Sequence, residues 1–289
     1  MDELSELLAA LAQTPSAVED RGYQIIKTSY ESPIADYKNI ASHRKVYARI
    51  PVEHIDWRYE DQVALWQRMK VFTPEFTFPE QATGDERVYH RRNDFFCDID
   101  GFTLYTILRE LKPKQLIEIG SGYSTKLISA AMEKNGAKGD QITCIEPYRA
   151  DVIRSLNVTC HKTPLEDLEL SMFDRLGYGD VLFVDSSHVV KPYGDVMLIF
   201  THILPRLAPG VWVHFHDIFL PFDYPESWMV AQRRAYCEQY LLSAFMANNS
   251  AWEVKFAVNY FVNRMGVANV QREAGLLHED GGSFWIRRR

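Results

Sequence analysis

The segment Leu116-Ile-Glu-Ile-Gly-Ser-Gly-Tyr-Ser-Thr125 carries the strongest fold signal in the chain. Its first four residues are apolar except for Glu118, which is typical of a short buried strand, and a helical run over residues 126–134 follows the loop. The two glycines let a ligand approach the backbone, and loop amides at a helix N-terminus can hold an anion or a polar head group. A dinucleotide fingerprint would need glycine at position 125, where this chain has threonine, and the Gly-Lys-Ser/Thr of a P-loop is absent.

The C-terminal two thirds of the chain alternate between strand and helix patterns. Helical runs cover residues 101–111 and 226–248 in addition to 126–134. Apolar runs predict strands at residues 115–119, 141–145, 158–161, 181–184, 211–216, 252–260 and 283–286. This alternation predicts an α/β fold with a Rossmann-like, mostly parallel sheet that helices cover on both faces.

Composition and charge exclude several classes of protein. The 289 residues are 46% hydrophobic and 25% charged, which is typical of a globular protein and argues against disorder, collagen-like repeats and coiled coil. A net charge of −7 makes nucleic acid an unfavourable partner. No apolar stretch approaches the roughly 18 residues that span a bilayer, so we expect no membrane association. The acidic N-terminus does not resemble a signal peptide, and the four cysteines lack C-x-x-C spacing, so we expect a cytoplasmic protein with free thiols.

A second acid, Glu146, ends the next predicted strand. An acid at this place accepts hydrogen bonds from both ribose hydroxyls, and the adjacent Pro147 stops the strand. Glu118, two residues before the first glycine, suits a ligand that carries an ammonium group. S-adenosylmethionine has both groups and has no phosphates that need a longer glycine loop. The two acids therefore predict S-adenosylmethionine as the ligand.

With these motifs the chain resembles the class I S-adenosylmethionine-dependent methyltransferases, and more closely the bacterial branch labelled methyltransferase family 24. The resemblance covers roughly residues 88–289. Besides the glycine loop, it rests on Asn93-Asp-Phe-Phe96, Ile145-Glu-Pro-Tyr148, Leu182-Phe-Val-Asp-Ser-Ser-His188, Val213-His-Phe-His-Asp-Ile-Phe-Leu-Pro221, Glu238-Gln-Tyr-Leu-Leu242 and Ser283-Phe-Trp-Ile-Arg287. It implies a seven-stranded sheet whose last hairpin is antiparallel, with the cofactor over the carboxyl ends of the first four strands.

The resemblance also implies a cofactor site. Glu118 and the two glycines would hold the methionine end, Glu146 would hold the ribose, and residues 163–165 would lie beside the adenine. The expected cofactor-binding residues are Glu118, Gly120, Ser121, Gly122, Tyr123, Ser124, Glu146, Pro147, Thr163, Leu165 and Asp185.

Polar clusters end the fourth and fifth predicted strands, at Asp185-Ser-Ser-His188 and His214-Phe-His216-Asp217. Ligands bind outside the carboxyl ends of strands in open α/β sheets, so these clusters mark the expected active site. In one interpretation His188 or His216 is a general base, oriented by a carboxylate, that deprotonates the acceptor. In another interpretation the histidines are structural. The expected catalytic residues are Asp185, His188, His216 and Asp217.

A divalent metal is a further possibility at the same place. Asp185 and Asp217 would be its ligands and would lower the pKa of the acceptor. Some related O-methyltransferases use acids at these strand ends, but they often carry a second acid or amide where this chain has Ile218. This departure from the pattern argues against the metal.

The acceptor side is less clearly marked in the sequence. The aromatic segment 218–225 follows the fifth strand and is a candidate lid or pocket wall, which makes Tyr224 and Trp228 candidate substrate-binding residues. Arg91 and Asn93 precede the helix that leads into the first strand, and they are further candidates. Arg91 could bind an acceptor carboxylate in a bidentate manner, or it could be a solvated side chain.

We expect two domains, a mainly helical cap or lid over residues 1–100 and the S-adenosylmethionine-binding methyltransferase domain over 101–289. The first hundred residues hold 12 Lys and Arg against 18 Asp and Glu, which is most of the net charge. The function predicted is methyl transfer to oxygen or nitrogen of a small-molecule acceptor, with a homodimer as a possible assembly. The alternatives are a non-methylating use of S-adenosylmethionine by intramolecular displacement, and a non-catalytic ligand-binding subunit with the same fold.

Overall fold

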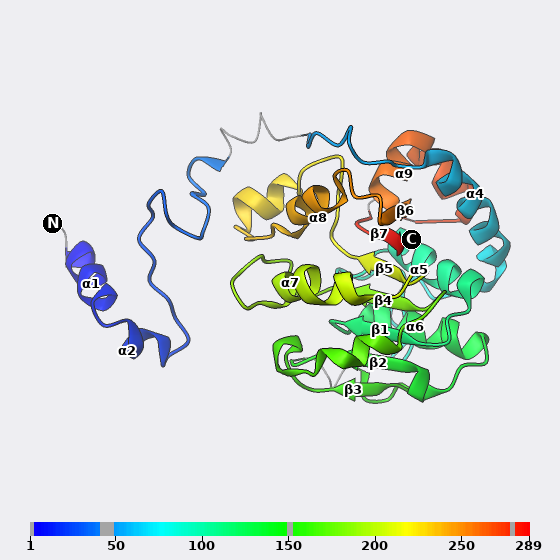
Figure 1. The fold of residues 1–289 in the computed structure, drawn as a ribbon, viewed down its shortest axis with the longest axis horizontal. Helices are drawn as coiled ribbons and strands as arrows, with labels where there is room; N and C mark the ends of the chain where they lie inside the picture. Colours follow the sequence, from blue (N-terminus) through cyan, green and yellow to red (C-terminus); the bar gives the residue numbers. More distant parts are fainter. Residues whose placement is uncertain (1–2, 41–48, 149–152, 278–280) are drawn as a thin grey trace. The chain divides into compact units, whose positions relative to one another are not determined.

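A mixed seven-stranded sheet dominates the part of the chain that the computed structural model describes, residues 3–40, 49–148, 153–277 and 281–289 (Figure 1). The strands lie in the order β3-β2-β1-β4-β5-β7-β6, and the first five are parallel. Strand β7 runs antiparallel to both of its neighbours. The strands are β1 Leu116–Ile119, β2 Ile142–Ile145, β3 Thr159–His161, β4 Val181–Val184, β5 Trp212–Phe215, β6 Trp252–Ala257 and β7 Phe284–Arg288. The predicted α/β sheet with an antiparallel last hairpin is confirmed.

The two faces of the sheet are covered by different helices, because side chains alternate along each strand. On one face, apolar residues of β1, β4 and β5 join a core cluster with α4 Tyr59–Met69, α5 Asp98–Leu111, α6 Tyr123–Lys134, α9 Val258–Met265 and α10 Val267–Ala274. On the other face, the cluster includes residues of α7 Asp195–Leu198 and α8 Glu238–Met246. Shorter helical turns are η1 Lys70–Glu75, η2 Gly139–Gln141, η4 Leu165–Asp167, η5 Leu170–Arg175, η6 Ile199–Ile203 and η7 Leu204–Arg206.

Several element boundaries differ from those predicted. Helix α5 begins at Asp98 rather than at residue 101, which brings two acids into its first turn. The single helix expected over residues 226–248 is two elements, η8 Ser227–Ala231 and α8. Arg233 between them has a φ of +54°, a conformation that an α-helix cannot continue through. The strand predicted over 252–260 ends at Ala257, where α9 begins.

The predicted division at residue 100 stays a prediction, and the compact units of the structure divide at other residues. The chain divides into one compact unit of residues 47–224 and 236–289 and a second of residues 1–46 and 225–235, whose described part includes α1 Glu3–Ala12 and α2 Pro15–Glu19. Residues 52–100 belong to the sheet-containing unit because their apolar side chains, including Trp66, Phe76 and Tyr89, are buried in its core. A capping role for the segment before this unit stays a prediction. No helix among the described residues has the length and apolar character to cross a membrane.

Candidate active site

Gly120 directly follows β1 and lies beside the end of β4. Its φ is +79°, and a Cβ at this position would stand 1.8 Å from the carbonyl oxygen of Asp185. Backbone hydrogen bonds hold both segments, because Gly120 donates to the carbonyl of Ile145 and Asp185 donates to the carbonyl of Ile119, each at 2.9 Å. Only glycine fits here, so the loop starts in contact with the strand end that carries Asp185.

Gly122 meets a different requirement. Its φ of 173° is extended backbone, and a Cβ at this position would meet no heavy atom within 4 Å. Its N–H donates to Oγ1 of Thr125 at 2.9 Å at the start of α6. The side of the loop at Gly122 is therefore open, as a backbone approached by a ligand requires.

Glu118 lies beneath this loop and is fully buried. Its Oε1 accepts from Ser124 Oγ at 2.7 Å, and its Oε2 accepts from Thr125 Oγ1 at 2.7 Å and from Ser121 Oγ at 3.1 Å. Cys144 Sγ also donates to Oε2, at 3.3 Å. Burial raises the pKa of Glu118 to about 7, although these donors favour the charged form. The carboxyl group organises the loop through its side chains, and its predicted contact with an ammonium group stays a prediction.

A pocket of about 260 Å³ opens beside the loop, at the carboxyl ends of β1, β2 and β4. Glu146 is 7% exposed and lines it, with Oε2 accepting from the backbone N–H of Ser121 at 3.0 Å and Oε1 from that of Tyr148 at 2.7 Å. Five of the predicted cofactor-binding residues line the pocket, namely Gly120, Glu146, Pro147, Leu165 and Asp185. Six do not line it, namely Glu118, Ser121, Gly122, Tyr123, Ser124 and Thr163. Lining residues that were not predicted include Tyr148, Ser186, Ser187, Lys191 and Asp195.

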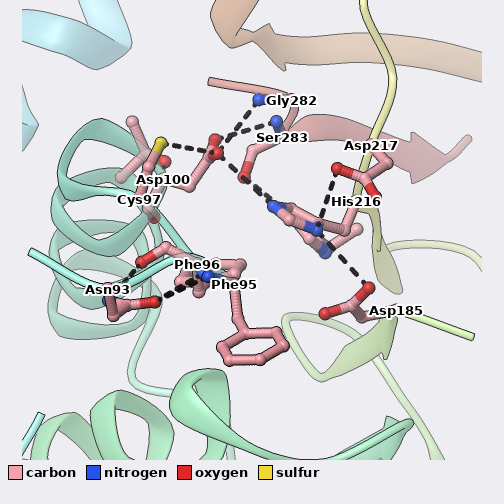
Figure 2. Close-up of polar contacts among 12 residues, drawn as sticks. Asn93, Phe95, Phe96, Cys97, Asp100, Asp185, His216, Asp217, Gly282 and Ser283 are labelled. Carbon is pink, nitrogen blue, oxygen red and sulfur yellow. Dashed lines mark hydrogen bonds and ion pairs between the residues drawn. The ribbon is translucent and has the colours of Figure 1, made fainter. Parts of the chain in front are cut away.

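The four predicted catalytic side chains meet at the ends of β4 and β5. Nε2 of His188 lies 3.3 Å from Oδ1 of Asp185 and 3.5 Å from Oδ2 of Asp217. Nδ1 of His216 lies 3.4 Å from Oδ1 of Asp185 and 3.5 Å from Oδ1 of Asp217, as Figure 2 shows. Each imidazole therefore faces both carboxylates.

Two buried acids that were not among the predicted catalytic residues complete this cluster. Glu238, the first residue of α8, places Oε2 2.9 Å from Nδ1 of His188. Asp100, in the first turn of α5, places Oδ2 3.4 Å from Nε2 of His216. Asp100 is fixed in turn by the backbone N–H groups of Gly282 and Ser283, at 3.0 and 2.8 Å (Figure 2). For Asp100, the signal in the sequence was a pair of acids, Asp98 and Asp100, directly before the predicted helix.

These contacts set the protonation of the cluster. The pKa values of His188 and His216 are raised well above 6.5 because neighbouring carboxylates outweigh the effect of burial. The two imidazoles hold the pKa of Asp185 well below its usual range, despite its burial. Burial raises the pKa of Asp217 in spite of the same two imidazoles. The pKa values of Asp185 and Asp217 are thus shifted in opposite directions. In enzymes, such a difference between neighbouring carboxyl groups separates the acid role from the base role.

The arrangement limits what a ligand can meet. Both ring nitrogens of His188 and of His216 face carboxylates, so the carboxylate oxygens of Asp185 and Asp217 are the more accessible polar atoms, with side chains 26% and 14% exposed. Ionised carboxylates only accept hydrogen bonds, so this edge suits a hydroxyl or amine donor. Within the described parts of the chain, no group of three or more His, Cys, Asp or Glu has a metal-binding arrangement.

Comparison with known proteins identifies the domain. Residues 117–218 match the family model described as a methyltransferase domain. This region is a methyltransferase domain. The match and the strand order agree with the predicted class I methyltransferase fold, and dependence on S-adenosylmethionine stays a prediction.

Individual relatives of this methyltransferase are distant. An uncharacterized protein from Archaeoglobus fulgidus is 24% identical over 157 residues, which cover 51% of this chain and 71% of that protein. The S-adenosylhomocysteine-bound methyltransferase PaMTH1 from Podospora anserina has a TM-score of 0.44 and 16% identity, over 92% of this chain and 99% of that one. The O-methyltransferase TomG from Streptomyces achromogenes, in complex with S-adenosylmethionine, has a TM-score of 0.44 and 15% identity, over 76% and 94%. Scores of this size establish no detail, so the site rests on its own geometry.

Two predicted substrate residues of the methyltransferase have internal partners. Arg91 donates from Nε and Nη2 to the carboxylate of fully buried Asp98, at 2.6 and 2.9 Å, and from Nη2 to the carbonyl of Gly275 at 2.7 Å. It is therefore not the solvated side chain that one interpretation expected. The amide of Asn93 bonds four backbone groups of residues 90–96 and so holds the turn before α5 (Figure 2).

The aromatic candidates differ from each other. Tyr224 is fully buried, and its OH accepts a hydrogen bond from the backbone N–H of Gln239 at 3.1 Å. Trp228 belongs to the other compact unit, where the guanidinium of Arg234 lies 4.0 Å from its ring centre. A role in acceptor binding stays a prediction for all four candidates.

Proposed function

We propose that this methyltransferase transfers the methyl group of S-adenosylmethionine to a hydroxyl or amine of a small-molecule acceptor held at Asp185 and Asp217. One observation carries the proposal: Asp185 lines the pocket beside the glycine loop and also contacts both imidazoles of the polar cluster. A single side chain therefore connects the donor site with the acceptor site. The short distance that methyl transfer requires between donor and acceptor follows from this connection.

The residues of the pocket fit the cofactor. S-adenosylmethionine supplies an electrophilic methyl group on a positively charged sulfur. Glu146, directly after β2, is held in place by backbone donors and lines the pocket, where it would accept hydrogen bonds from the ribose hydroxyls. Leu165 provides an apolar surface for the adenine. Gly120 and Gly122 leave the backbone of the loop accessible to the methionine end.

The cluster provides for removal of the acceptor proton. An acceptor hydroxyl or ammonium donates to the oxygens of Asp185 and Asp217. Because its pKa is raised, Asp217 is the better proton acceptor of the two, whereas Asp185 stays ionised and orients the acceptor. His188 and His216, each held by a second carboxylate, stabilise the negative charge of the pair. This assignment changes the expected general base from a histidine to an aspartate supported by histidines.

The test combines binding and product analysis. Isothermal titration should show S-adenosylmethionine binding to the protein and to Asp185→Asn, and weaker binding to Glu146→Gln. Incubation with a panel of small hydroxyl and amine compounds should give S-adenosylhomocysteine and an acceptor heavier by one CH₂, as measured by mass spectrometry. Asp217→Asn should lose turnover while it still binds the cofactor.

Other outcomes would contradict the proposal. Absence of cofactor binding at millimolar concentration would exclude every form of it. A product derived from S-adenosylmethionine alone would indicate intramolecular displacement. A biological role that survives Asp185→Ala and His216→Ala but not Glu146→Ala would indicate a non-catalytic binding subunit.

A further inference from the structure

A second cavity, of about 310 Å³, lies at the edge of the sheet opposite the active site. Lys114 and Gly179 precede β1 and β4, Trp212 begins β5, and Arg287 lies near the end of antiparallel β7, and all four line this cavity. These positions are the amino ends of the parallel strands, whereas the active-site cluster follows their carboxyl ends. The cavity is therefore separate from the methyl-transfer site.

The lining of this amino-edge cavity is cationic. Arg68, Lys112, Lys114 and Arg287 line it together with one carboxylate, Glu110, so its formal charge is +3 in a protein whose net charge is −7. Glu110 already accepts a hydrogen bond from Arg68 at 2.8 Å. In the part of the chain that the structure describes, no carboxylate lies within 4.0 Å of the ammonium group of Lys112 or Lys114. Most of this positive charge is therefore available to an anion.

Arg287 adds to the excess of positive charge. Its partner is Glu253, which is buried and is shared with Arg58, Lys255 and Arg289. Glu253 is thus contacted by four cations, of which Arg58 also pairs with Asp61. The Nε atom of Arg287 is buried and has no hydrogen-bond partner. Glu253 therefore compensates only part of the charge of Arg287, whose side chain is 29% exposed and lines the cavity.

An aromatic ring borders the same cavity. Tyr178 lines the cavity and is 82% exposed, and its ring packs against the backbone of Gly210. A Cβ at Gly210 would stand only 2.2 Å from Cδ2 of this ring. Position 210 favours glycine for two reasons, its φ of +90° and this close contact with Tyr178. The ring presents a flat surface that bases and other planar groups stack on.

We propose that the amino-edge cavity binds a nucleoside diphosphate or a small molecule that contains one. The phosphates lie against Lys112, Lys114 and Arg287, and the base stacks on Tyr178. Cations suit the phosphates of a nucleotide, and an exposed aromatic ring suits its base. The cavity volume is at the lower end of the range for small-molecule sites. This inference does not depend on which acceptor the enzyme methylates.

The experiment is isothermal titration of the full-length protein at low ionic strength, with the cofactor pocket saturated by S-adenosylhomocysteine. Uridine diphosphate is the main probe because it lacks the adenosine that the cofactor pocket is proposed to bind. Pyrophosphate and uridine test the two halves separately. We expect uridine diphosphate to bind with submillimolar affinity, pyrophosphate to bind several-fold more weakly, and uridine to show no binding.

Matched variants locate the site. Lys112→Glu with Lys114→Glu should weaken uridine diphosphate at least tenfold, whereas Lys27→Glu with Lys38→Glu, which has the same change in net charge elsewhere, should leave it unchanged. Tyr178→Ala should bring the affinity for uridine diphosphate down to that for pyrophosphate. Unchanged affinity for S-adenosylhomocysteine shows that each variant is folded. If the glutamate double variant loses this affinity, Lys112→Gln with Lys114→Gln is used in its place.

Three results would overturn the proposal. The first is absence of binding by uridine diphosphate at several millimolar. The second is equal binding by the lysine variant and its control, which would place the nucleotide elsewhere. The third is tighter binding of a single-stranded oligonucleotide than of uridine diphosphate, which would indicate a nucleic-acid surface instead.

Discussion

Nδ1 of His188 lies 2.9 Å from Oε2 of Glu238, fifty residues later in the chain. The contact is fully buried on the glutamate side, so it fixes the ring with Nε2 toward Asp185 and Asp217. A carboxylate behind a histidine sets the orientation and charge of the ring in many active sites. Glu238 is therefore a positioning residue for the cluster.

Glu238→Gln should keep the fold and the affinity for S-adenosylmethionine but lower kcat by about tenfold to a hundredfold, because the amide no longer stabilises a charged imidazole. The measurement is steady-state kinetics once an acceptor is known, with the pH at half-maximal kcat shifted relative to the parent protein. Tyr240→Phe, close by on α8, serves as the control. Equal kcat and an unchanged pH profile in Glu238→Gln would contradict the positioning role.

The two glycines of the loop should respond differently to the same substitution. Gly120→Ala places a methyl group against the carbonyl of Asp185 and requires a positive φ, so we expect a loss of several kcal/mol in the free energy of unfolding. Gly122→Ala has free space and an extended φ, so stability should change by less than about 1 kcal/mol while affinity for S-adenosylmethionine falls. Urea denaturation and isothermal titration separate the two effects. Equal loss of stability in both variants would refute this distinction.

Cofactor binding should depend on the protonation of Glu118. Its pKa is raised to about 7, so it is largely protonated at pH 6 and largely ionised at pH 8. A bound ammonium group favours the ionised form, so affinity for S-adenosylmethionine should rise across this range and binding near pH 7 should release a proton. Titration calorimetry in buffers of different ionisation enthalpy measures that release. Glu118→Gln should abolish it, and a proton release that persists in this variant would assign it to another group.

Glu118 should also affect stability with the opposite sign. The folded protein holds a proton on Glu118 that the unfolded chain, with a pKa near 4.5, has already lost. The free energy of unfolding should therefore fall as the pH rises from 4.5 to 7, by about 3 kcal/mol relative to Glu118→Gln. Denaturant unfolding of both proteins at several pH values tests this. Parallel stability curves for the two would contradict the assignment.

Arg91 and Asp98 should matter for stability rather than for acceptor binding. Asp98 is fully buried and Arg91 is its bidentate partner, so Arg91→Ala leaves an uncompensated buried charge and should cost about 3 kcal/mol. Arg92→Ala, which removes an exposed pair with Glu80, should cost less than about 1 kcal/mol. Thermal unfolding compares the two variants. An Arg91→Ala variant as stable as Arg92→Ala would restore Arg91 as a candidate acceptor ligand.

The sequence predicted what local spacing determines. The alternation of strands and helices was sufficient for the sheet, and the glycine loop with Glu146 was sufficient for the pocket beside it, because these residues lie within thirty positions of one another. Adjacent carboxylates and imidazoles at Asp185–His188 and His214–Asp217 predicted the polar cluster for the same reason.

The remaining features depend on contacts that no local pattern encodes. Asp100 meets His216 across 116 positions, and Arg91 reaches the carbonyl of Gly275 across 184. Helix α5 begins at Asp98, three residues earlier than predicted. Its buried first turn therefore contains Asp98, which binds Arg91, and Asp100, which contacts His216. The structure pairs Arg91 with Asp98, seven residues away, and its contact with an acceptor stays a prediction.

The backbone N–H groups of Gly282 and Ser283, which hold Asp100, belong to the last eight residues of the chain. They lie directly before β7, so the pairing of this strand with β5 holds the segment that fixes Asp100. Truncation after residue 281 would remove both backbone donors to Asp100 and so loosen its contact with His216, which would keep Asp185 and Asp217 as carboxylate neighbours. A tag or fusion placed after β7 should therefore leave the pairing of this strand with β5 undisturbed.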